Sequence, residues 1–148
     1  CPERKKAIDI FFKKWEKDAL VMDKWLAIQA QSFLPSTLDE VKALLNHPIF
    51  SYNIPNKVRA LVGAFTQNHV LFHKTDGSGY RFLKEQILIA DKKNPQLAAR
   101  IASPFQKAPK VSSTRKELMK KEMEEIVATP GISKHVYEIV SSVLKELK

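Results

Sequence analysis

Apolar side chains recur every three or four residues along almost the whole chain, and this spacing is what most limits the fold. In residues 133–147, a stripe runs through Val136, Ile139, Val140 and Val143. Such a stripe forms one face of an α-helix that packs against a neighbour. No run of alternating β-branched and aromatic residues indicates a strand. The sequence therefore predicts an all-α fold.

Prolines and a few glycines fall between the apolar stripes and divide the chain into about eight expected helices. These helices cover approximately residues 2–18, 19–32, 37–45, 55–67, 78–92, 94–105, 113–128 and 133–147. Short helices joined by short breaks are typical of stacked antiparallel pairs. We therefore predict a superhelical, armadillo- or HEAT-like stack in a single domain, residues 1–148. An irregular helical bundle is the alternative, because no fixed repeat period is visible.

The sequence also predicts helix caps, a close packing contact, a buried helix face and a loop at particular residues. Thr37 and the glutamate three residues later fit a capping box, and Ser78 is expected to cap the following helix. Gly63 lies inside an expected helix, where glycine costs up to about 1 kcal/mol relative to alanine, so we expect a neighbouring backbone to pack closely there. The aromatic and aliphatic residues of segment 2–18 are expected to be buried along one face. Segment 107–113 is expected to be a flexible loop.

The net charge is +9, and positive charge is concentrated between Lys92 and Lys121. Glu117 is the one acid among nine basic side chains: Lys92, Lys93, Arg100, Lys107, Lys110, Arg115, Lys116, Lys120 and Lys121. Such a block can attract nucleic acid or an acidic partner, although the simpler interpretation is a solvated surface. Phe105 is the only aromatic residue there, whereas single-strand binders use several for stacking. A free-standing helical-repeat binding module, using residues 92–121 for an acidic partner or nucleic acid, is thus the alternative function.

The sequence offers little material for catalysis. Its single cysteine, Cys1, excludes an internal disulfide and a cysteine-based zinc site. It also suits a reducing compartment, so we expect a cytoplasmic protein. His69 and His73 are four residues apart and on a helix could share a metal, but no H-E-x-x-H motif surrounds them. We expect a helix-end pair with one ring packed and one exposed, and no catalytic or metal-binding residue in this chain. The sequence contains no apolar run of about 18 residues, so no membrane-spanning helix is expected.

Two arginines are candidate binding groups. Arg59 lies beside an apolar stripe, and Asn56 and Gly63 share its helical face at three and four residues. Arg100 lies one turn after Gln96, so a guanidinium group and an amide project together. The arginine fork suits a carboxylate because it can donate two parallel hydrogen bonds. The alternative is that each arginine pairs with an acid on a neighbouring helix.

Four segments taken together resemble the last helical domain of bacterial-type aminopeptidase N, a zinc peptidase. They are Val21-Met22-Asp23-Lys24-Trp25, Asn53 to Phe65, Phe72-His73 with Asp76-Gly77-Ser78-Gly79-Tyr80, and Asn94-Pro95-Gln96 with Ala99-Arg100. The family's H-E-x-x-H zinc motif and its G-x-M-E-N motif are both absent from this sequence. The resemblance implies that zinc and the catalytic residues belong to another part of a longer polypeptide.

The resemblance also implies a role for this domain. In that family the domain is a superhelix of helix pairs, which closes over the catalytic domain and restricts access to zinc. At matching positions, Arg59, Gln96 and Arg100 contact the downstream part of a peptide. The implied partners are the catalytic domain of the same polypeptide and peptide substrates, with no membrane or nucleic-acid partner expected. Alone, this part is expected to be inactive.

Overall fold

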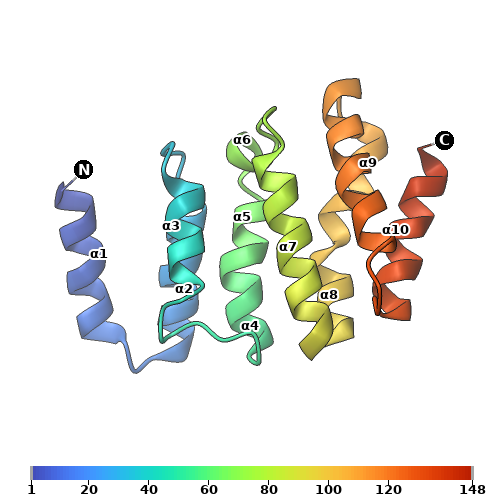
Figure 1. The fold of residues 1–148 in the computed structure, drawn as a ribbon. Helices are drawn as coiled ribbons and strands as arrows, with labels where there is room; N and C mark the ends of the chain where they lie inside the picture. Colours follow the sequence, from blue (N-terminus) through green and yellow to red (C-terminus); the bar gives the residue numbers. More distant parts are fainter. Residues whose placement is uncertain (1, 148) are drawn as a thin grey trace. The chain divides into compact units, whose positions relative to one another are not determined.

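A computed structural model describes residues 2–147, and in this range it contains helices and turns but no strand (Figure 1). The prediction of an all-α fold is confirmed. The chain consists of two compact units, the first ending at Asn68 and the second beginning at His69. Within the described range, no helix combines the length and the apolar character that crossing a membrane would require.

The first unit is built around α2. Its elements are α1 (Pro2–Trp15), α2 (Ala19–Ala30), α3 (Thr37–Leu44), and a continuous helix formed by α4 (Pro55–Val58), η1 (Arg59–Gly63) and α5 (Ala64–Thr66). α2 packs against α1, α3 and this last helix (Figure 1). Its core consists of buried apolar residues, among them Met22, Trp25, Leu26, Val41, Val58, Leu61, Val62 and Phe65. The last four are the inward positions that helical periodicity predicts for residues 55–67.

The second unit is built around α7. Its elements are α6 (His69–Phe72), α7 (Ser78–Lys93), α8 (Pro95–Ile101), η2 (Ser103–Lys110, 3₁₀-helical), α9 (Ser113–Val127) and α10 (Lys134–Glu146). α7 packs against α8 and α9, and α10 packs against α8, α9 and η2. The buried core includes Tyr80, Leu83, Ile87, Leu97, Phe105, Met119, Met123, Val136 and Val140. These positions also agree with the helical spacing read from the sequence.

Two polar contacts tie helices together inside the units. In the first unit, the buried Lys57 extends its Nζ to 2.6 Å from Asp23 Oδ1 and 3.0 Å from the carbonyl oxygen of Ala19. In the second unit, the backbone N–H of Ser133 donates to Asp91 Oδ2 at 2.9 Å, and the Ser133 hydroxyl also donates to this carboxylate. The start of α10 is thereby fixed to the end of α7.

The expectation that segment 2–18 is buried along one face is wrong. α1 ends at Trp15 and contains no buried residue, and the side chains of Phe11 and Trp15 are 40% and 38% exposed. The inner contacts of α1 are made with α2, where the Phe12 and Trp25 ring centroids are 5.0 Å apart. Only the face toward that neighbour is covered, so the rest of the apolar stripe stays in solvent.

Helix starts and one connection also differ from expectation. Ser36, not Thr37, precedes α3; it makes no side-chain cap bond, and the Thr37 hydroxyl is buried without a partner among the described residues. At α7, Asp76 Oδ1 accepts from the backbone N–H of Ser78 at 2.9 Å, so Ser78 is the first helical residue and not the cap. Most of the expected loop 107–113 is 3₁₀-helical, because η2 extends to Lys110.

Two helical glycines have opposite surroundings. A Cβ added at Gly63 would meet only the Cβ of Arg59, at 3.9 Å, so the expected close neighbouring backbone is absent there. A Cβ added at Gly79 would lie 2.3 Å from the carbonyl oxygen of Phe72. The close approach that the sequence suggests at Gly63 is therefore found at Gly79, where the end of α6 meets the first turn of α7.

Candidate functional site

Arg59 begins a π-helical turn. The turn covers Arg59–Gly63, and the backbone N–H of Ala64 donates to the carbonyl oxygen of Arg59, one residue further back than in an α-helix. Buried Val58, Leu61 and Val62 hold the inner side of this helix against the core. The Arg59 side chain is exposed on the outer side, where its Nη1 donates to Asn56 Oδ1 at 3.4 Å.

Gln96 and Arg100 lie one turn apart on α8, as predicted, and both are exposed. The helix begins because Asn94 Oδ1 accepts from the backbone N–H of Leu97 at 3.1 Å, with Pro95 in the first turn. Buried Leu97, together with its apolar neighbours, anchors the opposite face. The amide and the guanidinium group are therefore presented from a fixed helix.

Among residues 2–147, neither candidate arginine makes an ion pair with an acid of its own unit, so the alternative of a structural ion pair finds no support there. Arg59 belongs to the first unit, whereas Gln96 and Arg100 belong to the second. The structure brings Gln96 and Arg100 together on one helix. A role shared by all three residues stays a prediction.

His69 and His73 form part of a cluster in the second unit. Their rings stack with centroids 6.0 Å apart; His69 is exposed and His73 is partly buried, as expected of a helix-end pair. His73 Nδ1 lies 2.6 Å from Tyr80 Oη, and Arg115 Nε donates to the His73 carbonyl oxygen at 2.7 Å. Burial lowers the pKa of His73, and the nearby positive charges of His69, Arg115 and Lys107 lower it further. The sequence indicates the histidine pair but not Tyr80 or Arg115.

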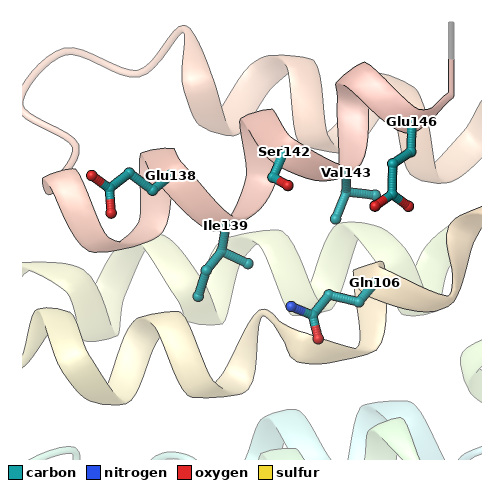
Figure 2. Close-up of a pocket in the computed structure, with 6 residues that line it drawn as sticks. All are labelled: Gln106, Glu138, Ile139, Ser142, Val143 and Glu146. Atoms are coloured by element: carbon teal, nitrogen blue, oxygen red, sulfur yellow. The ribbon is translucent and has the colours of Figure 1, made fainter.

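Two of the hollows on the described surface, one in each unit, are lined by none of the candidate residues. In the second unit, a depression of about 320 Å³ lies between η2 and α10 (Figure 2). Its lining residues are Gln106, Glu138, Ile139, Ser142, Val143 and Glu146. In the first unit, a groove of about 530 Å³ is formed by residues of α1, α2 and α3, and the Arg4–Glu40 ion pair lies on its wall. Both hollows are open and mixed in polarity, and neither gathers a catalytic constellation.

No group of three or more metal-ligating side chains is found among residues 2–147, and H-E-x-x-H is absent from the sequence. The residues described here therefore do not fit a zinc site. The basic block of residues 92–121 is distributed over α7, α8, η2 and α9, with Lys107, Lys110 and Lys121 exposed. In the described range, the candidate groups are thus exposed cationic and amide side chains.

These features define the chain as an all-α protein that presents exposed cationic and amide side chains from packed helices. The family model described as "Domain of unknown function (DUF3458_C) ARM repeats" matches residues 1–145, and the chain belongs to this family. Armadillo repeats are the stacked helical architecture predicted from the sequence.

The relatives are aminopeptidases. The chain is 39% identical over 137 residues to aminopeptidase N of Haemophilus influenzae, covering 91% of this chain and 16% of that protein. It is 40% identical over 142 residues to aminopeptidase N of Caulobacter vibrioides, covering 95% of this chain and 16% of the relative. A crystal structure of Legionella pneumophila aminopeptidase A in complex with aspartic acid superposes with a TM-score of 0.94 at 31% identity, covering 99% of this chain and 17% of that one.

The chain thus spans about a sixth of the length of these relatives, as the 16% and 17% shares show. The resemblance to a helical domain of aminopeptidase N is confirmed.

Proposed function

We propose that this chain is the non-catalytic C-terminal domain of a zinc aminopeptidase that removes N-terminal residues from peptides. One observation carries the proposal: nearly the whole chain matches aminopeptidase N, while it corresponds to only 16% of that protein. In this proposal, zinc and the peptide-cutting residues belong to the remainder of the polypeptide. The domain closes the catalytic chamber and restricts access to short or unfolded peptides. The relatives favour this function over a free-standing binding module.

Arg59, Gln96 and Arg100 are proposed to hold the downstream part of the peptide. All three are exposed, and neither arginine is committed to an acid within residues 2–147. A guanidinium group can donate two parallel hydrogen bonds to a carboxylate, and an amide can bond to a peptide group. Fixed donors of this kind contribute to the rate as well as to affinity, because they orient the bond to be cut. The net charge of +9 also favours approach of the negative end of a peptide.

The test uses the complete enzyme with Arg59→Ala, Gln96→Ala and Arg100→Ala, singly and together. We compare kcat/KM for a tripeptide with kcat/KM for a single-residue amide substrate, which has no downstream peptide. Each arginine variant should lower the tripeptide value more, by about tenfold for the loss of a charge-assisted hydrogen bond.

The two substrates separate positioning from general damage. Equal losses on both would argue against a downstream role for these residues. An isolated preparation of residues 1–148 that cleaved peptides after addition of zinc would overturn the non-catalytic assignment.

A further inference from the structure

Neither the backbone angles nor the neighbouring atoms among residues 2–147 require glycine at position 63. Its backbone angles are helical, with φ −61° and ψ −42°, so no left-handed conformation demands it. Glycine also weakens a helix relative to alanine, because it loses more conformational freedom. A Cβ at this position would be at ordinary van der Waals distance, 3.9 Å, from the Cβ of Arg59, its only near neighbour. The side chain nearest to a Cβ at position 63 is therefore that of Arg59.

The direction of helical side chains makes this neighbour relation specific. A side chain on a helix leans toward the N-terminus and covers the turn before its own Cα. A longer side chain at position 63 would thus lie over Arg59, one turn earlier. Among residues 2–147, the exposed Arg59 guanidinium makes one hydrogen bond, the long 3.4 Å bond to Asn56 Oδ1. With glycine at 63, no side chain extends from that position over Arg59.

The backbone supplies a second observation. The π-helical turn begins at Arg59 and ends at Gly63, so the two residues bound the same irregular turn. π turns are rare and appear mostly as single insertions in α-helices, frequently at functional sites. The irregular turn therefore joins the exposed arginine to a glycine that packing within the described residues does not explain.

We propose that Gly63 is a specificity-determining residue that keeps the Arg59 guanidinium open to a peptide carboxylate. With no side chain at 63, the fork of Arg59 can turn from Asn56 and donate two parallel hydrogen bonds to the ligand. This inference rests on the proposed function, in which Arg59 contacts the downstream part of the peptide. The ligand class is a peptide with a free carboxylate near the cut bond.

The test is a series of variants of the complete enzyme in which the side chain at position 63 becomes larger. The variants are Gly63→Ala, Gly63→Gln and Gly63→Leu, with Arg59→Ala, the double variant Arg59→Ala/Gly63→Leu, and Gln67→Leu as a matched control. Gln67 is exposed at the end of the same helix, so its replacement adds the same leucine away from Arg59. The readout is the ratio of kcat/KM for a tripeptide to kcat/KM for its amidated form and for a single-residue amide.

The ratio of kcat/KM for the tripeptide to kcat/KM for the single-residue amide should fall progressively as the side chain at position 63 grows from alanine to leucine. The decrease should reach about tenfold and come from a higher KM for the tripeptide, while Gln67→Leu leaves the ratio unchanged. The double variant should match Arg59→Ala, because covering a guanidinium that is absent costs nothing further. If Arg59→Ala lowers the ratio but Gly63→Leu and Gly63→Gln do not, the inference about Gly63 is refuted and the proposed function stands. The inference is also refuted if the losses of kcat/KM from Arg59→Ala and Gly63→Leu add in the double variant, or if Gly63→Leu lowers kcat/KM equally for all substrates. Either result would indicate a structural role for Gly63. If Arg59→Ala itself leaves the ratio unchanged, the role proposed for Arg59 fails as well.

Discussion

Replacing Gly79 by alanine should destabilise the second unit, although the same change normally strengthens a helix. The added Cβ would lie 2.3 Å from the carbonyl oxygen of Phe72, so the end of α6 and the first turn of α7 must separate by roughly 1 Å to restore a normal contact. The neighbouring side chains cannot yield easily, because Phe72 and Tyr80 are 1% and 0% exposed and their ring centroids are 5.1 Å apart.

The magnitude follows from two opposing terms. Forcing extra volume into a packed contact costs about 1–3 kcal/mol, occasionally more. Alanine recovers up to about 1 kcal/mol of helix propensity. We expect the free energy of unfolding to fall by about 1–2 kcal/mol, which corresponds to a melting temperature lower by roughly 3–6 °C for a chain of this size.

The matched control is Gly63→Ala. The Cβ there meets nothing closer than 3.9 Å, so only the propensity gain remains and the free energy of unfolding should rise by about 0.5–1 kcal/mol. Urea denaturation followed by circular dichroism measures both variants. Similar stabilisation by the two substitutions would refute the close approach at Gly79.

Three further changes test other contacts. Lys57→Ala should lower the free energy of unfolding by about 3 kcal/mol, because it leaves the Asp23 carboxylate without its cation. Urea denaturation midpoints measure this loss, and a change below about 1 kcal/mol would argue against a stabilising Lys57–Asp23 ion pair. Since the pKa of His73 is lowered in the folded state, its neutral form contributes stability above the ordinary value of 6.5 and loses it as the pH falls. The urea midpoint should therefore drop less between about pH 7.5 and pH 5 in His73→Asn than in the unmodified protein; identical drops would contradict this assignment. Asn94→Ala should cost about 1 kcal/mol by removing the α8 cap, whereas Asn94→Ser should retain most of it in the same denaturation assay.

Helical periodicity was sufficient for much of the core. Val58, Leu61 and Phe65 are buried as their spacing predicts, and Asn94 caps α8 as its position before a proline suggests. These features depend on nearby residues in sequence. The pairing of Gln96 with Arg100 on one helix face follows from the same local geometry.

Features that depend on tertiary neighbours were not predictable in this way. Gly63 and Gly79 both interrupt apolar helices, and only the position of the α6 backbone shows which glycine is required by packing. The apolar stripe of α1 looks like an ordinary core face, yet Trp15 remains 38% exposed because α2 covers only one side. The π turn at Arg59–Gly63 leaves no distinctive pattern in the sequence. The candidate role of Arg59 came from family resemblance and not from periodicity.

The joint between Asp91 and Ser133 limits how this protein can be shortened. Asp91 is 7% exposed, and both of its carboxylate oxygens accept hydrogen bonds from Ser133. A version ending before Ser133 would lose more than the terminal helix. The Asp91 carboxylate would lose both hydrogen-bond donors from Ser133, and the buried side chains of Val136 and Val140 would be missing from the core. An engineer seeking a minimal scaffold should therefore keep α10, or replace Asp91 with a neutral residue in the same step.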